Sequence, residues 1–202
     1  HENYLMDRSV PFGRIVVHAM AHFITRQLFI GAGKVGSEAA GVSWREVPFQ
    51  LTQRADFFEE EVGLETTLKR PIVNTRDEPH SDAQKYRRLH VICGDANLSE
   101  VATFLKVGTT AIVLAMVEDD ALPREFVFAA PVATMRNVSY DLSLSRAFEL
   151  DDGSTVTALE VQWELLDAAK KYAESTGLEA VGAEVGAEVL RRWEDVLSGL
   201  ET

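Results

Sequence analysis

The order of the sequence patterns constrains the fold of this chain more than any other feature. Most short segments rich in β-branched and aromatic residues lie before residue 95, bounded by Gly, Pro and polar breakers. From residue 97 onward, apolar residues recur mainly at helical spacing. Strands that cluster early and helices that cluster late indicate an α+β fold.

Helical periodicity and capping residues together locate the helices. Asn97 followed by Glu100 is typical of a helix start, and Thr157 with Glu160 forms the pattern of a capping box. The helix that starts at Asn97 is apolar and could bend at Gly108. The predicted helices cover residues 12–29, a long stretch from 97, residues 131–138, a segment after 157, and about 183–200.

Breakers and β-rich composition predict the strands. Residues 151–153, Asp-Asp-Gly, are typical of a tight turn, so residues 148–157 should form a hairpin. The other predicted strands cover residues 48–52, 71–75 and 88–94.

Composition favours one globular domain with an ordinary core, since 46% of the 202 residues are hydrophobic and 26% are charged. The formal charge of -12 argues against non-specific binding to nucleic acid or to an anionic membrane. No apolar run is expected to approach the roughly 20 residues that span a bilayer. The only cysteine, Cys93, is expected to be a small buried side chain, which fits a reducing cytoplasm.

Residues 31–36 match G-x-G-x-x-G, the pattern of a dinucleotide-binding loop. That mechanism needs a strand before the glycines and a helix after them, whereas here a predicted helix precedes and a polar loop follows. We therefore expect an ordinary loop. No Ser/His/Asp order, C-x-x-C pair or H-E-x-x-H motif supports a common hydrolase chemistry.

Polar residues at alternate positions are the candidates for chemistry. Arg88 and His90 lie two apart in a predicted strand, so they should project from the same face. Two cations side by side would repel, which favours a neutral His90 that ligates a metal while Arg88 binds a phosphate. A strand with polar residues on its solvent side is the alternative.

The start of the chain and a charged loop also contain polar residues that could bind a ligand. His1 and Asn3 alternate in the same way and could share one face, with an imidazole for a metal and a carboxamide for a nucleotide. In the charged loop at residues 76–80, Arg76 is the residue best suited to hold a phosphate or polarise a carbonyl.

Three longer segments carry a resemblance to a known family. They are residues 70–80, 86–91 and 94–100. They resemble the Pup ligase/Pup deamidase family, whose members are related to glutamine synthetase and to glutamate-cysteine ligase. Residues 50–57, 62–70 and 108–111 are similar to its deamidase branch in particular.

The resemblance implies a glutamine-synthetase-like fold, an antiparallel sheet cradle with helices packed on one face. It also implies an enzyme that binds ATP and Mg²⁺, deamidates the C-terminal Gln of Pup and cleaves the isopeptide bond between Pup and substrate lysines. Residues 1–202 would be the central and C-terminal part of one catalytic domain. Because the chain opens with His rather than Met, we expect a piece of a larger protein.

The resemblance also assigns roles to single residues. His1 and His90 would be metal ligands, Asn3 and Arg88 would bind the nucleotide, and Arg76 would bind a phosphate or an oxyanion. The nucleophilic aspartate would lie upstream of His1, so another part of the enzyme would have to complete the site.

Two alternatives stay open from the sequence. The first is the Pup ligase, and the second is a non-catalytic module that binds Pup. Because Pup is acidic, a local groove with apolar contacts is expected to bind it. The basic residues that could line this groove are Lys69, Arg70, Lys85, Arg87 and Lys106.

Overall fold

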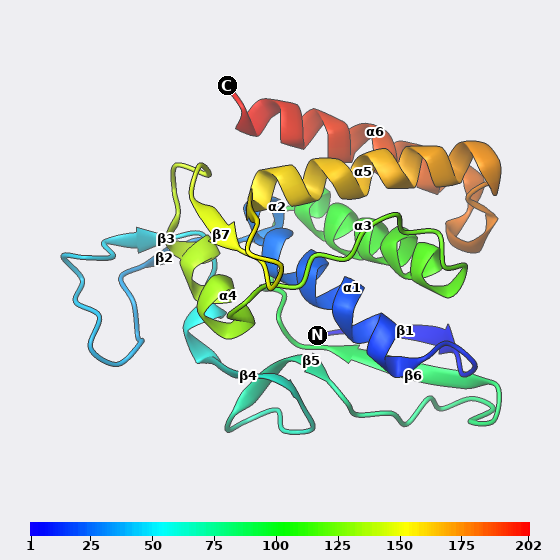
Figure 1. Ribbon diagram of the computed structural model, residues 1–202, viewed down its shortest axis with the longest axis horizontal. Helices are drawn as coiled ribbons and strands as arrows, with labels where there is room; N and C mark the ends of the chain where they lie inside the picture. Colours follow the sequence, from blue (N-terminus) through cyan, green and yellow to red (C-terminus); the bar gives the residue numbers. More distant parts are fainter.

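A computed structural model describes residues 1–202 and shows helices stacked over small sheets (Figure 1). The strands are β1 (Glu2–Asp7), β2 (Lys34–Val35), β3 (Phe49–Gln50), β4 (Phe58–Gly63), β5 (Arg70–Asn74), β6 (Tyr86–Val91), β7 (Ala147–Glu149) and β8 (Thr155–Thr157). The helices are α1 (Phe12–Thr25), α2 (Gln27–Ile30), α3 (Glu100–Glu118), α4 (Pro131–Tyr140), α5 (Ala158–Ser175) and α6 (Ala183–Leu200), with 3₁₀ turns η1 (Ala55–Phe57) and η2 (Glu179–Val181). The predicted α+β class is confirmed.

Strand pairing is antiparallel in three pairs and parallel in one. β1 pairs with β6, β2 with β3 and β7 with β8, all antiparallel, and the predicted hairpin at β7–β8 is confirmed. β4 and β5 pair in parallel, which differs from the expected antiparallel sheet. The reason is the connection: residues 64–69 run back along β4, so β5 starts at the same end.

Helix α3 lies at the centre of the hydrophobic core. It packs against α1, α2, α5 and α6, and β1 lies against it as well. By length and composition alone α3 could cross a membrane, with a mean hydropathy of 1.6, so the expectation that no apolar run approaches this length was wrong. Its contacts with several neighbouring elements account for its apolar composition.

Two helix starts test the capping predictions. Thr157 and Glu160 make the complete capping box at the start of α5, as predicted. At α3 the cap is Ser99 rather than Asn97, because the Ser99 side chain accepts from the Ala102 amide. Asn97 instead donates its amide to the Ile30 carbonyl at 2.9 Å, so it links the loop to α2.

Gly31, the first glycine of the motif at residues 31–36, serves chain packing, and no helix directly follows the motif. Gly31 ends α2, and a Cβ there would lie 2.2 Å from the Leu51 carbonyl oxygen. Two residues of the motif form the short strand β2, and the expected loop follows at residues 36–48. The strand–loop–helix arrangement of a dinucleotide-binding loop is therefore absent.

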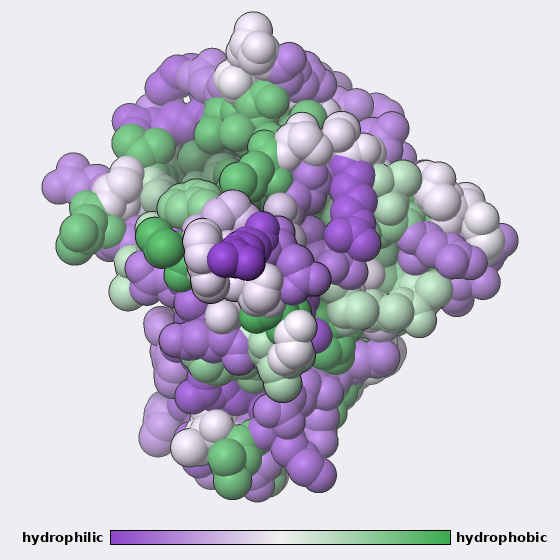
Figure 2. Space-filling model, turned by 90° about the vertical axis from the view of Figure 1, so that its left-hand side faces the viewer, coloured by the Kyte–Doolittle hydropathy of each residue, from purple (hydrophilic) through white to green (hydrophobic).

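The face nearest the β2–β3 loop carries apolar patches among hydrophilic residues (Figure 2). Val35 and Trp44 are exposed there, at 85% and 69%. Figure 2 shows apolar residues on this face in patches, separated by hydrophilic ones. Isolated exposed apolar residues of this kind are ordinary on a protein surface.

Gly108 lets two helices approach closely in an unbroken α3. A Cβ at Gly108 would lie 2.4 Å from Cγ2 of Val189 on α6. The glycine thus has a packing role, in place of the bend that its position in the sequence suggested.

We expect Gly108→Ala to lower the free energy of unfolding by about 1–3 kcal/mol, because the added methyl overpacks the α3–α6 contact. The matched control is Gly199→Ala on α6, where a Cβ meets nothing within 4 Å. It should leave stability unchanged or raise it by up to about 1 kcal/mol. Urea unfolding of both variants measures the difference, and equal stabilities would contradict the packing role.

Candidate functional site

The β1–β6 pair brings the predicted site residues together. Asn3 lies directly opposite His90 in the ladder, and its Oδ1 is 2.8 Å from His90 Nδ1. Arg88 Nη1 donates to the same oxygen at 3.5 Å, so Arg88 and His90 share one face as predicted. The His1 ring stands edge-on to the His90 ring, with 5.1 Å between the centroids.

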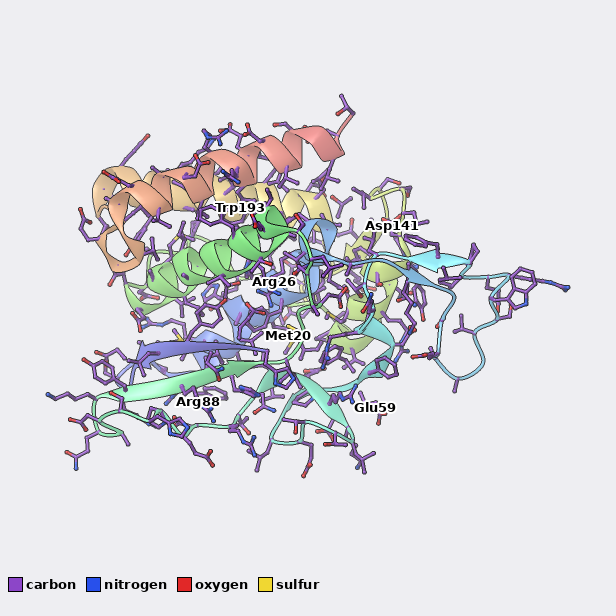
Figure 3. The ribbon with its side chains drawn as sticks, turned by 180° about the vertical axis from the view of Figure 1, so that it is seen from behind. Met20, Arg26, Glu59, Arg88, Asp141 and Trp193 are labelled. Carbon is purple, nitrogen blue, oxygen red and sulfur yellow. The ribbon has the colours of Figure 1, made fainter.

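Alternation along β1 explains this arrangement. Glu2 and Met6 are buried on the side of the helices, whereas Leu5 is exposed on the side of Asn3. Figure 3 shows Arg88 beside the sheet, away from the helical layer. The site therefore lies on the face of the β1–β6 pair that α1, α3, α5 and α6 leave uncovered.

The surroundings of His90 favour its neutral form. Burial lowers the pKa of its imidazole, and the positive charges of Arg88 and Arg76 lower it further. Asn3 Oδ1 accepts from Arg88, so it also accepts from His90, and the ring proton lies on Nδ1. The Nε2 lone pair of His90 is then available to a ligand.

A cavity of about 220 Å³ opens beside this cluster. Arg76, Arg87 and Arg88 line it, and the Arg87 guanidinium lies 5.1 Å above the ring of Phe12. Arginine forks of this kind match the oxygens of phosphate and carboxylate groups. The structure thus brings Arg76, predicted from the loop, to the same place as Arg88.

Acidic residues fix the loop that carries Arg76. Asp77 accepts from the Arg8 guanidinium and, at 3.2 Å, from the Arg88 amide. Burial works against the charge of this carboxyl, but the hydrogen bonds from Arg8 and Arg88 lower its pKa. Glu78, with its side chain 72% exposed, lies 3.5 Å from Arg88 and is the weaker partner. The Arg8–Asp77 pair joins residues 69 positions apart and had no signal in the sequence.

The residues of this chain do not by themselves fit a magnesium site. His1 and His90 offer nitrogen donors, whereas Mg²⁺ prefers oxygen ligands in octahedral geometry. No group of three or more His, Cys, Asp or Glu side chains could hold a metal ion. Metal ligation by His1 and His90 therefore stays a prediction.

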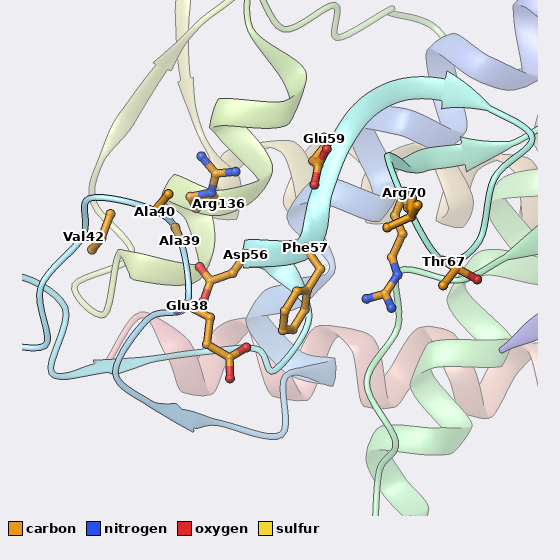
Figure 4. Close-up of a pocket in the computed structure, with 11 residues that line it drawn as sticks. Glu38, Ala39, Ala40, Val42, Asp56, Phe57, Glu59, Thr67, Arg70 and Arg136 are labelled. Atoms are coloured by element: carbon orange, nitrogen blue, oxygen red, sulfur yellow. Dashed lines mark hydrogen bonds between the residues drawn. The ribbon is translucent and has the colours of Figure 1, made fainter.

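A second, larger cavity of about 500 Å³ lies beside β4 and α4. Figure 4 shows Arg136 of α4 on one side and Arg70 of β5 on the other, with Phe57 between them. Glu38 and Glu59 also line this cavity, so its charges are mixed.

Asp56, at the floor of the larger cavity, is a structural anchor that the sequence did not reveal. It accepts hydrogen bonds from the Tyr140 hydroxyl at 2.6 Å, Gln50 Nε2 at 2.9 Å and Lys34 Nζ at 3.0 Å. Burial opposes its charge, but these donors hold the pKa of Asp56 below its ordinary value. A carboxylate engaged by so many donors is a poor nucleophile, and its partners come from three separate segments.

Three of the basic residues expected in a Pup groove lie at different places in the structure. Lys106 is engaged, because its ammonium donates to the Asp95 carbonyl at 2.8 Å and to Asn97 Oδ1 at 2.9 Å. Arg70 lies at the larger cavity and Arg87 at the smaller one. These hydrogen bonds make Lys106 less available to a partner, and the groove itself stays a prediction.

A comparison of the whole sequence with known families identifies the family of the chain. A sequence model of the family described as "Pup-ligase protein" matches residues 1–202. The chain belongs to the Pup-ligase family. The chain is 56% identical over 200 residues to a depupylase of Acidothermus cellulolyticus, covering 98% of the chain and 38% of that relative. It is 46% identical to a Pup deamidase/depupylase of Mycolicibacterium smegmatis, covering 100% and 39%.

Ligases of the Pup-ligase family are similar as well. The chain is 43% identical to a Pup–protein ligase of Kineococcus radiotolerans, covering all of the chain and 43% of that relative. Two solved structures, the Pup ligase PafA with ADP and the complex of Pup with PafA, match with TM-scores of 0.85 and 0.84. Their sequence identities are 39% and 38%; the matches cover 99% and 98% of the chain, and 43% and 40% of those structures. The chain spans about two fifths of the length of its relatives.

We expect Arg88→Gln to raise the pKa of His90, because it removes a neighbouring positive charge that disfavours the imidazolium form. An NMR titration of the imidazole resonances measures the shift. Arg191→Gln, at an exposed ion pair on α6, serves as the control and should leave His90 unchanged. A His90 pKa that is the same in all three proteins would contradict the electrostatic description.

Proposed function

We propose that this chain forms the nucleotide-binding half of a Pup deamidase/depupylase site. The single observation that carries the proposal is the convergence on Asn3 Oδ1, where neutral His90 and cationic Arg88 both donate. The arginine-lined cavity beside it suits a phosphate chain. The ADP bound to PafA, a relative of matching fold, supports a nucleotide here.

Each residue of the cluster has a defined task in this proposal. Arg88 and Arg76 bind phosphate oxygens, and Arg76 can instead face the oxyanion that forms during amide hydrolysis. Asn3 orients His90 and contacts the nucleotide. ATP is the proposed nucleotide, and Mg²⁺ would require oxygen ligands from the phosphates and from other parts of the protein.

The attacking carboxylate is proposed to come from outside residues 1–202. Asp77 beside the cavity is already bound to Arg8 and to the Arg88 amide. Residues 1–202 would then be the central and C-terminal part of one catalytic domain. The unpaired, buried thiol of Cys93 supports the proposed cytoplasmic location.

Sequence identity favours the deamidase over the ligase. The depupylase and the deamidase/depupylase relatives are 56% and 46% identical to the chain, against 43% for the ligase of Kineococcus radiotolerans. Amide hydrolysis then acts on the C-terminal Gln of Pup and on the bond between Pup and a substrate lysine. The ligase is the second candidate, because its structures share the fold.

The first test uses the intact protein with Pup that ends in Gln. Ammonia release without conjugate formation is the expected result, measured by a coupled ammonia assay and by gel shift. ATP consumption with formation of a Pup–protein conjugate would instead identify a ligase.

The second test separates an enzyme site from a non-catalytic Pup-binding module. We expect Arg88→Ala to weaken ADP binding by about 10- to 100-fold, because it removes a charge-assisted hydrogen bond to phosphate. Calorimetric titration measures the affinity, and Arg124→Ala at an exposed ion pair is the control. Unchanged ADP affinity in Arg88→Ala would leave the binding module as the better description.

A further inference from the structure

A buried ion pair lies directly behind the site residues of β1. Glu2 stands between His1 and Asn3 in the chain, points to the opposite side of the strand and is 8% exposed. Its carboxylate binds Arg26 through two bonds, Nη2 to Oε1 at 2.7 Å and Nη1 to Oε2 at 2.8 Å. Arg26 is completely buried at the junction of α1 and α2.

The pair is tied to further elements. Arg26 Nη1 donates to the Thr110 hydroxyl at 2.7 Å and to the Lys106 carbonyl at 3.2 Å, both on α3. The Tyr4 hydroxyl donates to Glu2 Oε2 at 2.6 Å. Figure 3 shows Arg26 in the interior, between the helices and the sheet. Strand β1, the α1–α2 junction and α3 therefore meet at one guanidinium.

We propose that Glu2, Arg26 and Thr110 are positioning residues, not ligands, whose network holds β1 so that Asn3 reaches the nucleotide. This inference rests on the nucleotide site described under the proposed function. Adjacent strand residues share one backbone, so holding Glu2 on the helical side fixes Asn3 on the other.

The chemistry of the pair supports positioning over simple stabilisation. A buried ion pair adds little net stability compared with apolar residues of the same size, because both charges lose their hydration. The bidentate contact of Arg26 with Glu2 instead restrains geometry, since two parallel hydrogen bonds fix both the distance and the angle of the carboxylate. A strand held only by apolar packing would lack this directional restraint.

Helix α3 supplies a matched control one residue away. Thr109 and Thr110 are both fully buried, and each hydroxyl also donates to the carbonyl four residues earlier, at 2.7 and 2.9 Å. Only Thr110 receives a hydrogen bond from Arg26. Both hydroxyls face His22 Nε2, Thr110 at 3.0 Å and Thr109 at 3.5 Å, so either substitution also removes a contact with that ring. Replacing either by Val removes the same hydroxyl at nearly constant volume.

The test measures ADP affinity and melting temperature in the intact protein. We expect Thr110→Val to weaken ADP binding about fivefold or more. Thr109→Val should keep wild-type affinity at a similar loss of melting temperature. Thr110→Ser, which restores the hydroxyl, should return the affinity to that of the wild type.

The outcomes separate this inference from the proposed function. Wild-type protein that does not bind ADP would refute the nucleotide site itself. ADP binding that is equal in wild type and Thr110→Val, or equally weakened in Thr109→Val, would overturn the positioning role alone. If Thr110→Val does not fold, Glu2→Gln replaces it, because this change keeps the shape and removes the charge. Unchanged ADP affinity in Glu2→Gln would likewise overturn the role.

Discussion

The antiparallel pairing of β1 with β6 is the constraint on which the site depends. It places Asn3 against His90, 87 residues later in the chain, and so joins the two parts of the candidate site. The same strand turns its other face to the core, where Glu2 binds Arg26. One short strand therefore carries both the polar cluster and its attachment to the helices, because successive side chains in a strand alternate between faces.

The charge around the smaller cavity is opposite in sign to the net charge of the chain. The net charge is -12, yet Arg76, Arg87 and Arg88 gather around one small cavity. Exposed charges farther apart than the Debye length of about 8 Å are largely screened at physiological ionic strength. The local arginines thus dominate at contact distance, while the acidic remainder discourages non-specific association with nucleic acid. The same arginines, together with burial, keep His90 neutral, so they influence the chemistry of their neighbour as well as the charge of the cavity.

The sequence predicted correctly the features that depend on residues close together in the chain, and less well those that depend on distant contacts. The hairpin at β7–β8 and the capping box of α5 were predicted correctly, because both depend on residues close together in the chain. Strand β4 was missed, because residues 59–61 are three glutamates and show no apolar alternation. The cap of α3 was placed two residues early, since Asn97 and Ser99 both have suitable side chains and packing decides between them.

By itself, the sequence determined the family, the α+β class and the shared face of Arg88 and His90, because motifs and strand periodicity are local properties. The tertiary structure alone decided that Asn3 meets His90, that Arg26 is buried against Glu2, and that Lys106 donates to the Asp95 carbonyl and to Asn97. These contacts join residues from different segments. Their geometry depends on how helices and strands fill one common core, which no short stretch of sequence contains.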